Sequence, residues 1–205
     1  MWINNFLFTV ALMWLTAQWK VIANKQIGIQ DDQLLGIVGS LCALSNGLGR
    51  FLWGVFYDLT NSFRVSMALQ TAICAVFIVT LPFIPSMSGS VELLFAVWMI
   101  IIWFCAGCDY AFLPSCIAET FGAKHVGSII GVFVMAEPPA MLIVVLLTSV
   151  EWLQQNFVYS CAIVAICCAL STALSVVYRS NRVDRRSFLK QSMSNMKKYG
   201  AVQKV

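Results

Sequence analysis

Three ionisable side chains, Arg50, Asp109 and Glu137, interrupt long apolar runs of this 205-residue chain. An ionisable residue inside an apolar membrane segment costs at least ~2.5 kcal/mol on insertion scales, so such a residue needs a functional or structural reason. A guanidinium that faces a polar cavity binds a carboxylate through two parallel hydrogen bonds. Asn46 lies one helical turn before Arg50 and can share the same ligand. Together these residues predict a binding site for a small anion.

Two other interpretations of Arg50 remain open. Its side chain can extend to the membrane surface, or it can pair with Asp58 near the end of the same apolar run. We favour the ligand-binding interpretation, because Asn46 supplies a second polar group on the same helical face.

Glu137 directly precedes Pro138 and Pro139 in the middle of another apolar run. Two successive prolines remove two helix hydrogen bonds and force a kink. Broken helices at membrane depth line a cavity or are buried in protein. Three interpretations of Glu137 stay open: a carboxylate that takes up a proton during transport, a protonated residue bonded to a neighbouring helix, or a residue particular to this one sequence.

The elements that must position these residues follow from composition and from the length of the apolar runs. Hydrophobic residues make up 60% of the chain and charged residues 11%, whereas soluble domains carry roughly 25% charged residues. A span of ~30 Å of hydrocarbon needs ~20 helical residues. We therefore predict an all-α membrane protein in which residues 1–178 form a bundle of six transmembrane helices. Their predicted ranges are 2–19, 34–57, 65–83, 91–113, 126–150 and 157–178.

The basic residues predict the orientation of this bundle. Eight of the 13 Lys and Arg residues lie in the segment 179–205, which predicts a basic cytoplasmic tail. Six spans then place both termini in the cytoplasm, together with Arg64 and Lys124, and leave Lys20 and Lys25 on the other side. The tail favours anionic membrane lipid as a partner and not nucleic acid. No motif names a particular membrane.

The eight cysteines are interpreted as packing residues, because all lie in or beside apolar runs. Cys105 and Cys108 have metal-site spacing, but no second pair accompanies them and His125 is the single histidine. We expect no metal, no cofactor and no enzymatic activity, since an intramembrane protease needs a serine and a histidine inside its spans.

Small residues form a stripe along the second apolar run, and Gly127 and Gly131 repeat the spacing on the fifth. The stripe consists of Gly36, Gly39, Ala43 and Gly47. Small residues let membrane helices approach closely, so both patterns predict helix packing.

The stretch from Asn46 to Asp58 reads NGLGRFLWGVFYD. It resembles the N-G-x-G-R-x-x-x-G-x-x-x-D signature of the major facilitator superfamily at helix 8, and is most similar to the monocarboxylate porter and oxalate/formate antiporter branch. Residues 107–122 resemble helix 10 of that branch, and residues 126–131 resemble the start of helix 11. The resemblance runs from about residue 36 to 136. It implies that the chain is the C-terminal half, helices 7–12, of a twelve-helix carrier.

The resemblance also implies a function. Arg50 matches the arginine that engages the substrate carboxylate, which implies secondary active transport of a small, monocarboxylate-like organic anion by alternating access. Some proton-coupled members carry an acid where this chain has Asn46, so symport and antiport both stay open. The fifth run has no second cation, which disfavours oxalate.

Two further expectations come from the resemblance. Gly54, Asp58 and Arg64 match a conformational latch motif, although Leu59 departs from its basic end. The N-terminal six-helix half, in the same chain or a separate one, is an expected partner. The alternative is a non-transporting subunit, or a truncated fragment, that assembles with another membrane protein.

Overall fold

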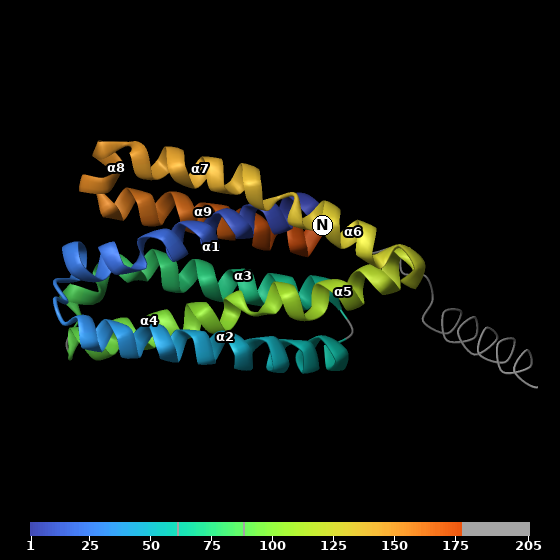
Figure 1. The fold of residues 1–205 in the computed structure, drawn as a ribbon, viewed down its shortest axis with the longest axis horizontal. Helices are drawn as coiled ribbons and strands as arrows, with labels where there is room; N and C mark the ends of the chain where they lie inside the picture. The colour runs from blue at the N-terminus through green and yellow to red at the C-terminus, as the bar shows by residue number, and fades with distance from the viewer. Residues whose placement is uncertain (61, 88, 178–205) are drawn as a thin grey trace, which may run out of the picture.

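The computed structural model describes residues 1–60, 62–87 and 89–177, so the predicted tail 179–205 lies outside the described residues. Within them the chain is helical and contains no strand, and the helices form an elongated bundle (Figure 1). The longer elements are α1 (Trp2–Val21), α2 (Asp32–Thr60), α3 (Phe63–Thr80), α4 (Val91–Ala106), α5 (Cys108–Phe121), α6 (Val126–Val134), α7 (Glu137–Ser149) and α9 (Phe157–Val177). The short ones are the π-helix η1 (Ile22–Ile27), the 3₁₀ segments η2 (Leu81–Ser86) and η3 (Ala123–His125), and α8 (Glu151–Gln155).

Five helical segments of the described residues are long and apolar enough to cross a membrane. They are Trp2–Ile27, Asp32–Thr60, Phe63–Ser86, Val126–Ser149 and Phe157–Val177. The all-α membrane fold is therefore confirmed. The predicted count of six is corrected, because the predicted helix 91–113 is broken at Gly107 into α4, with 16 residues, and α5, with 14. Figure 1 shows α5 continuing along the bundle from the end of α4.

The break predicted at the double proline is present. Helix α6 ends at Val134 and α7 begins at Glu137, so Pro138 and Pro139 occupy the first turn of α7. First-turn amides have no partner inside their own helix, so proline is tolerated there. The amide of Ala140 resumes the helical pattern by donating to the Ala136 carbonyl over 3.2 Å.

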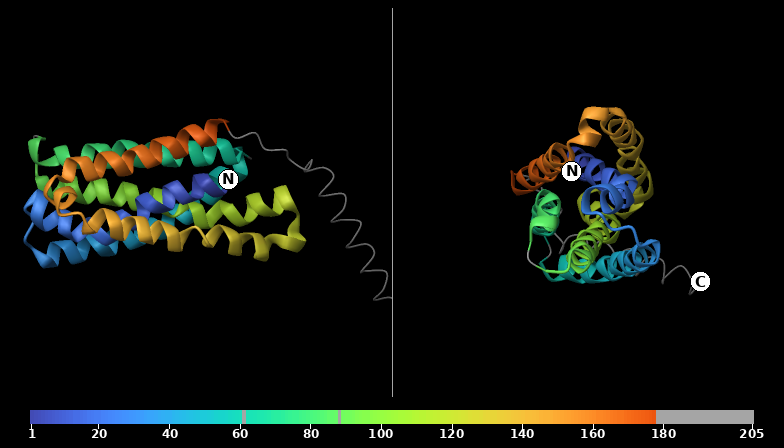
Figure 2. Two further views of the ribbon diagram at one scale, coloured as in Figure 1. Left: turned by 90° about the horizontal axis from the view of Figure 1, so that it is seen from above. Right: turned by 90° about the vertical axis from the view of Figure 1, so that its left-hand side faces the viewer.

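Helix packing divides the bundle into two connected groups, which Figure 2 shows end-on. Helix α2 packs on α4 and α5, whereas α1 packs on α9 and α7. Helix α3 joins the groups because it packs on both α9 and α4. Large apolar side chains fill the core between them, including Phe8, Leu15, Met67, Ile78, Phe95 and Met99.

A buried polar cluster ties α1, α3 and α9 together. Asn4 donates through Nδ2 to the Ser175 hydroxyl over 2.6 Å, and the Ser171 hydroxyl donates to Asn4 Oδ1. The hydroxyls of Thr71 and Thr172 lie 2.8 Å apart. Lipid offers no competing hydrogen-bond partners, so such contacts fix the register between helices.

Both described chain ends lie at one end of the bundle. The start of α1 and the end of α9 are together there (Figure 1), along with the end of α2 and the start of α6. The elements η1, η2 and α8 lie at the opposite end, which we call the Lys25 end. The basic residues predict the same division of chain ends and connections between the two ends of the bundle. That the end with both described chain ends faces the cytoplasm stays a prediction.

Most glycines of the small-residue stripe do not pack against another helix of the described residues. A Cβ atom added at Gly36 or Gly47 would meet no described atom within 4 Å, and the same holds at Gly127 and Gly131. The predicted packing of these patterns therefore stays a prediction for a partner outside this chain. Close approach of helices occurs instead at Gly49 and Gly107, which lie outside these patterns.

Candidate functional site

Helix α2 meets the break between α4 and α5 at two glycines. A Cβ atom at Gly49 would clash with the Phe104 carbonyl. A Cβ atom at Gly107 would clash with the Asn46 carbonyl and lie 2.9 Å from the backbone nitrogen of Arg50. Both positions therefore require glycine. The backbone of Arg50 lies directly against the break at Gly107.

Two side chains of α2 hydrogen-bond across the same contact. Ser45 donates to the Ile100 carbonyl over 2.9 Å, and Asn46 donates through Nδ2 to the Trp103 carbonyl over 3.2 Å. Both acceptors lie on α4. The bonds and the glycine contacts hold this part of α2 at a fixed position against α4.

Arg50 is held between an amide and an aromatic ring. Its Nε donates to Asn46 Oδ1 over 3.2 Å, and its Cζ lies 5.1 Å from the centre of the Tyr110 ring, which is cation–π geometry. The side chain is exposed, and among the described residues no carboxylate pairs with it. The two terminal nitrogens of the guanidinium are therefore available to bind an anion.

Tyr110 connects Arg50 to Glu137. Its hydroxyl donates to Glu137 Oε1 over 3.2 Å, which joins α5 to the start of α7. Asn46, Arg50, Tyr110 and Glu137 thus form one line of contacts across α2, α5 and α7. Glu137 is partly buried at the break between α6 and α7.

Sequence reasoning identified three members of this line, Asn46, Arg50 and Glu137, and did not select Tyr110. The available signal was a polar aromatic residue three positions after Gly107 and beside Asp109. The side chain of Asp109, also a predicted site residue, lies outside the part of the chain that the structure describes.

A cavity of about 300 Å³ lies beside Asn46, between α1, α2 and α4. It is lined by Trp19, Gly39, Cys42, Ala43, Asn46 and Trp103. Its walls are mostly apolar, and Asn46 links it to Arg50. Mostly apolar cavities with a few placed polar groups are typical of small-molecule sites. Two members of the small-residue stripe, Gly39 and Ala43, thus line this cavity.

The predicted latch residues are not brought together. Gly54 has open space around it, and Asp58 is exposed, without a hydrogen-bond partner among the described residues. Arg64 donates to the Val176 carbonyl at the end of α9. The nearby link between α2 and α5 is a hydrogen bond of 3.0 Å from the Tyr57 hydroxyl to Glu119. The latch role of Gly54, Asp58 and Arg64 stays a prediction.

None of the eight cysteines, all of which lie in the described ranges, forms a disulfide, and seven are buried. Cys105 and Cys108 lie on either side of the break at Gly107, in the core. Within the described ranges, no group of three or more His, Cys, Asp or Glu side chains is arranged to hold a metal ion.

Comparison with known proteins finds similarity to a carrier. The chain is 26% identical over 134 residues to apicoplast pyruvate carrier 1 of Toxoplasma gondii. The match covers 64% of this chain and 24% of that carrier, which is therefore more than twice as long as this chain. No family model and no solved structure matches the chain. The chain is thus an all-α, multi-pass membrane protein with similarity to part of a pyruvate carrier.

Proposed function

We propose that this chain is the C-terminal half of a secondary carrier of the major facilitator type that transports a small monocarboxylate, pyruvate or a close analogue. The observation that carries the proposal is Arg50, which lies between Asn46 and Tyr110 with its terminal guanidinium nitrogens available. The similarity to a pyruvate carrier supports the same class of substrate.

The local chemistry favours one carboxylate on a small apolar body. The guanidinium binds the carboxylate in bidentate geometry, and the apolar cavity beside Asn46 accepts the remainder of the molecule. A second carboxylate would add a negative charge that Arg50 alone, with Glu137 linked to it through Tyr110, does not balance. A monocarboxylate therefore suits the site better than a dicarboxylate such as oxalate.

Charge balance supports coupling of this substrate to a proton. With Arg50 cationic and Glu137 anionic, the pair is neutral before substrate binds, and a bound monocarboxylate adds one negative charge. A proton on Glu137 restores neutrality, so that no net charge crosses the membrane potential, which otherwise contributes ≈ 2.3 kcal/mol per charge per 100 mV. Tyr110 connects the proposed proton acceptor to the proposed anion clamp.

The proposed mechanism also requires the N-terminal half of the carrier, which we expect to contain six helices. Alternating access in this type of carrier arises when two halves move about a site near the middle of the membrane. The similar carrier is more than twice as long as this chain, which supports a partner half in the same or another chain.

The test is uptake of labelled pyruvate by the native full-length protein, reconstituted in liposomes. We expect saturable uptake that an inward proton gradient accelerates, with much slower uptake of oxalate. Folded protein that carries no pyruvate, but copurifies with a different membrane protein, would instead support the non-transporting subunit.

A further inference from the structure

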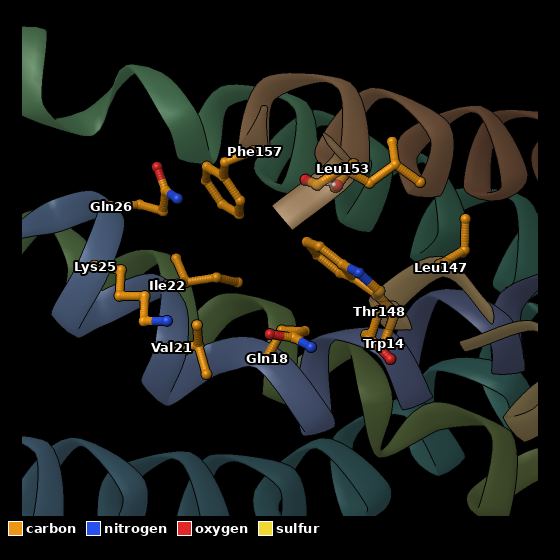
Figure 3. A pocket seen from close by; sticks show the side chains of 11 residues that line it. Trp14, Gln18, Val21, Ile22, Lys25, Gln26, Leu147, Thr148, Leu153 and Phe157 are labelled. Atoms are coloured by element: carbon orange, nitrogen blue, oxygen red, sulfur yellow. Dashed lines mark hydrogen bonds between the residues drawn. The ribbon is translucent and has the colours of Figure 1, made fainter. Parts of the chain in front are cut away.

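A second cavity, of about 210 Å³, lies at the Lys25 end of the bundle, between α1, η1, α7, α8 and α9 (Figure 3). Its polar rim includes Gln18, Lys25 and Gln26, and its apolar wall includes Trp14 and Phe157. Arg50 lies 18 residues beyond the first residue of α2, roughly 27 Å along that helix. The cavity is therefore remote from the Arg50 site.

The polar rim carries positive charge and amide donors. No acidic side chain of the described residues lines the cavity, so none of them neutralises the ammonium of Lys25 within it. The hydroxyls of Ser160 and Thr148 donate to the backbone carbonyls of Leu153 and Val144, over 2.8 and 2.9 Å. Lys25 and the carboxamides of Gln18 and Gln26 also line the cavity (Figure 3) and can donate to a ligand, as can the indole nitrogen of Trp14.

The apolar wall is built from two stacked aromatic rings. The ring centroids of Trp14 and Phe157 lie 6.3 Å apart at an interplanar angle of 17°. Both side chains are buried, with 3% and 8% of their surface exposed. A cationic rim above an aromatic wall suits a ligand with an anionic head and a short apolar body.

The backbone that carries Lys25 and Gln26 is unusual. Both residues lie in η1, a six-residue π-helix that ends at Gly28 with φ +86°. Gly28 adopts this left-handed conformation without the strain that a Cβ atom would add. Most π-helical segments are single turns, and they occur frequently at functional sites. The π-helix thus places the cation and one amide donor together at the cavity rim.

We infer that this cavity is a second binding site for a small organic anion, in which Lys25 binds the carboxylate and the rings of Trp14 and Phe157 contact its apolar body. The inference rests on the proposed function only for the class of ligand. The site captures the anion at the Lys25 end before it reaches Arg50, because a cation at a cavity entrance raises the local concentration of anions.

An anionic lipid presents the same chemistry as a small carboxylate, namely a negative head on an apolar body. The two sources are distinguished by comparing liposomes of phosphatidylcholine alone with liposomes that also contain phosphatidylserine. If the cavity binds the solute, Lys25→Gln should raise the KM for pyruvate in both lipid mixtures.

The test compares Lys25→Gln with Lys20→Gln in the full-length carrier. Lys20 lies on the same apolar span toward the same end and is exposed, but it does not line the cavity. Since Lys25→Gln removes a charge-assisted hydrogen bond to the carboxylate, we expect it to raise the KM for pyruvate entering from the Lys25 end about tenfold. Because a substitution cannot change the equilibrium of transport, the kcat/KM measured from the other side without a gradient should fall by the same factor, and Lys20→Gln should have no effect.

Three results would overturn the inference. Equal effects of the two substitutions would indicate a general surface field, and no effect of either would exclude a role for the cavity. An effect confined to phosphatidylserine liposomes would assign the site to lipid. Equilibrium binding of labelled pyruvate separates this inference from the proposed function. We expect two sites in the native carrier and one in Lys25→Gln, even if transport fails.

Discussion

Tyr110 donates a hydrogen bond of 3.2 Å to Glu137, and this bond joins α5 to the start of α7. The face of the same ring lies 5.1 Å from the guanidinium carbon of Arg50. One side chain therefore contacts both the proposed anion clamp and the proposed proton acceptor. The two contacts use different parts of Tyr110, so substitutions can separate them.

Removing only the hydroxyl should uncouple transport from protons. In Tyr110→Phe the ring still faces Arg50, so the KM for pyruvate should change less than about threefold, which corresponds to about 0.6 kcal/mol. The bond to Glu137 is lost, so stimulation of uptake by an inward proton gradient should fall. Uptake is measured with and without that gradient. Tyr159→Phe is the control, because Tyr159 is exposed near the Lys25 end. Full gradient stimulation in Tyr110→Phe would contradict the proposed coupling.

Neutralising Glu137 should have a stronger effect on the same measurement. In Glu137→Gln the described part of the site carries no carboxylate, so net uptake should no longer respond to the proton gradient. Exchange of labelled for unlabelled pyruvate should continue, because Arg50 is unchanged. Glu151→Gln serves as the control, since Glu151 is exposed at the start of α8. The coupling proposal fails if Glu137→Gln still accumulates pyruvate along a proton gradient.

A methyl group at Gly49 should destabilise the protein. Gly49→Ala forces the side chain against the Phe104 carbonyl, and overpacking of this kind costs typically 1–3 kcal/mol. Gly47→Ala, on the same helix, meets open space and should be neutral or slightly stabilising because alanine favours the helix. Thermal unfolding in detergent compares the two variants. Equal stability would show that α2 and α4 do not pack closely at Gly49.

The buried polar cluster predicts a stability difference between two adjacent asparagines. Asn4→Ala removes the side-chain bonds to Ser171 and Ser175. At about 0.6 kcal/mol for each interhelical bond in a membrane protein, the loss should be about 1 kcal/mol or more. Asn5 is only partly buried, so Asn5→Ala should cost less. Thermal unfolding of the two variants in detergent tests whether Asn4→Ala loses more stability than Asn5→Ala. A larger loss in Asn5→Ala would contradict the assigned cluster.

Much of the fold could be predicted from the sequence, because a span needs a long apolar run. The positions of breaks were harder to predict. The double proline indicated the break at Glu137, since proline lacks an amide hydrogen. Gly107 gave no comparable signal, because glycine is frequent inside membrane helices. Its role depends on the contact with Asn46 and Arg50, which the sequence does not display.

The candidate site, like the fold, could be predicted from the sequence only in part. The pairing of Asn46 with Arg50 follows from helical periodicity, because residues four apart lie on one face. Tyr110 is 60 positions from Arg50, so their contact depends on how α5 packs against α2. The small-residue stripe, for a related reason, did not identify the glycines at which helices of this chain approach closely. A small residue permits close packing, but a partner helix must also be present, and Gly36 and Gly47 have none within this chain's described residues.

The most direct test of the central claim is pyruvate transport by Arg50→Ala in the full-length carrier, with Arg64→Ala as the matched control. Both arginines are exposed, but Arg64 contacts the end of α9 instead of the candidate site. Loss of a charge-assisted bond of ≈ 1.5–3 kcal/mol should raise the KM for pyruvate roughly 10- to 100-fold in Arg50→Ala. Arg64→Ala should retain the native KM. A folded Arg50→Ala carrier that transports pyruvate with the native KM and rate would contradict the account.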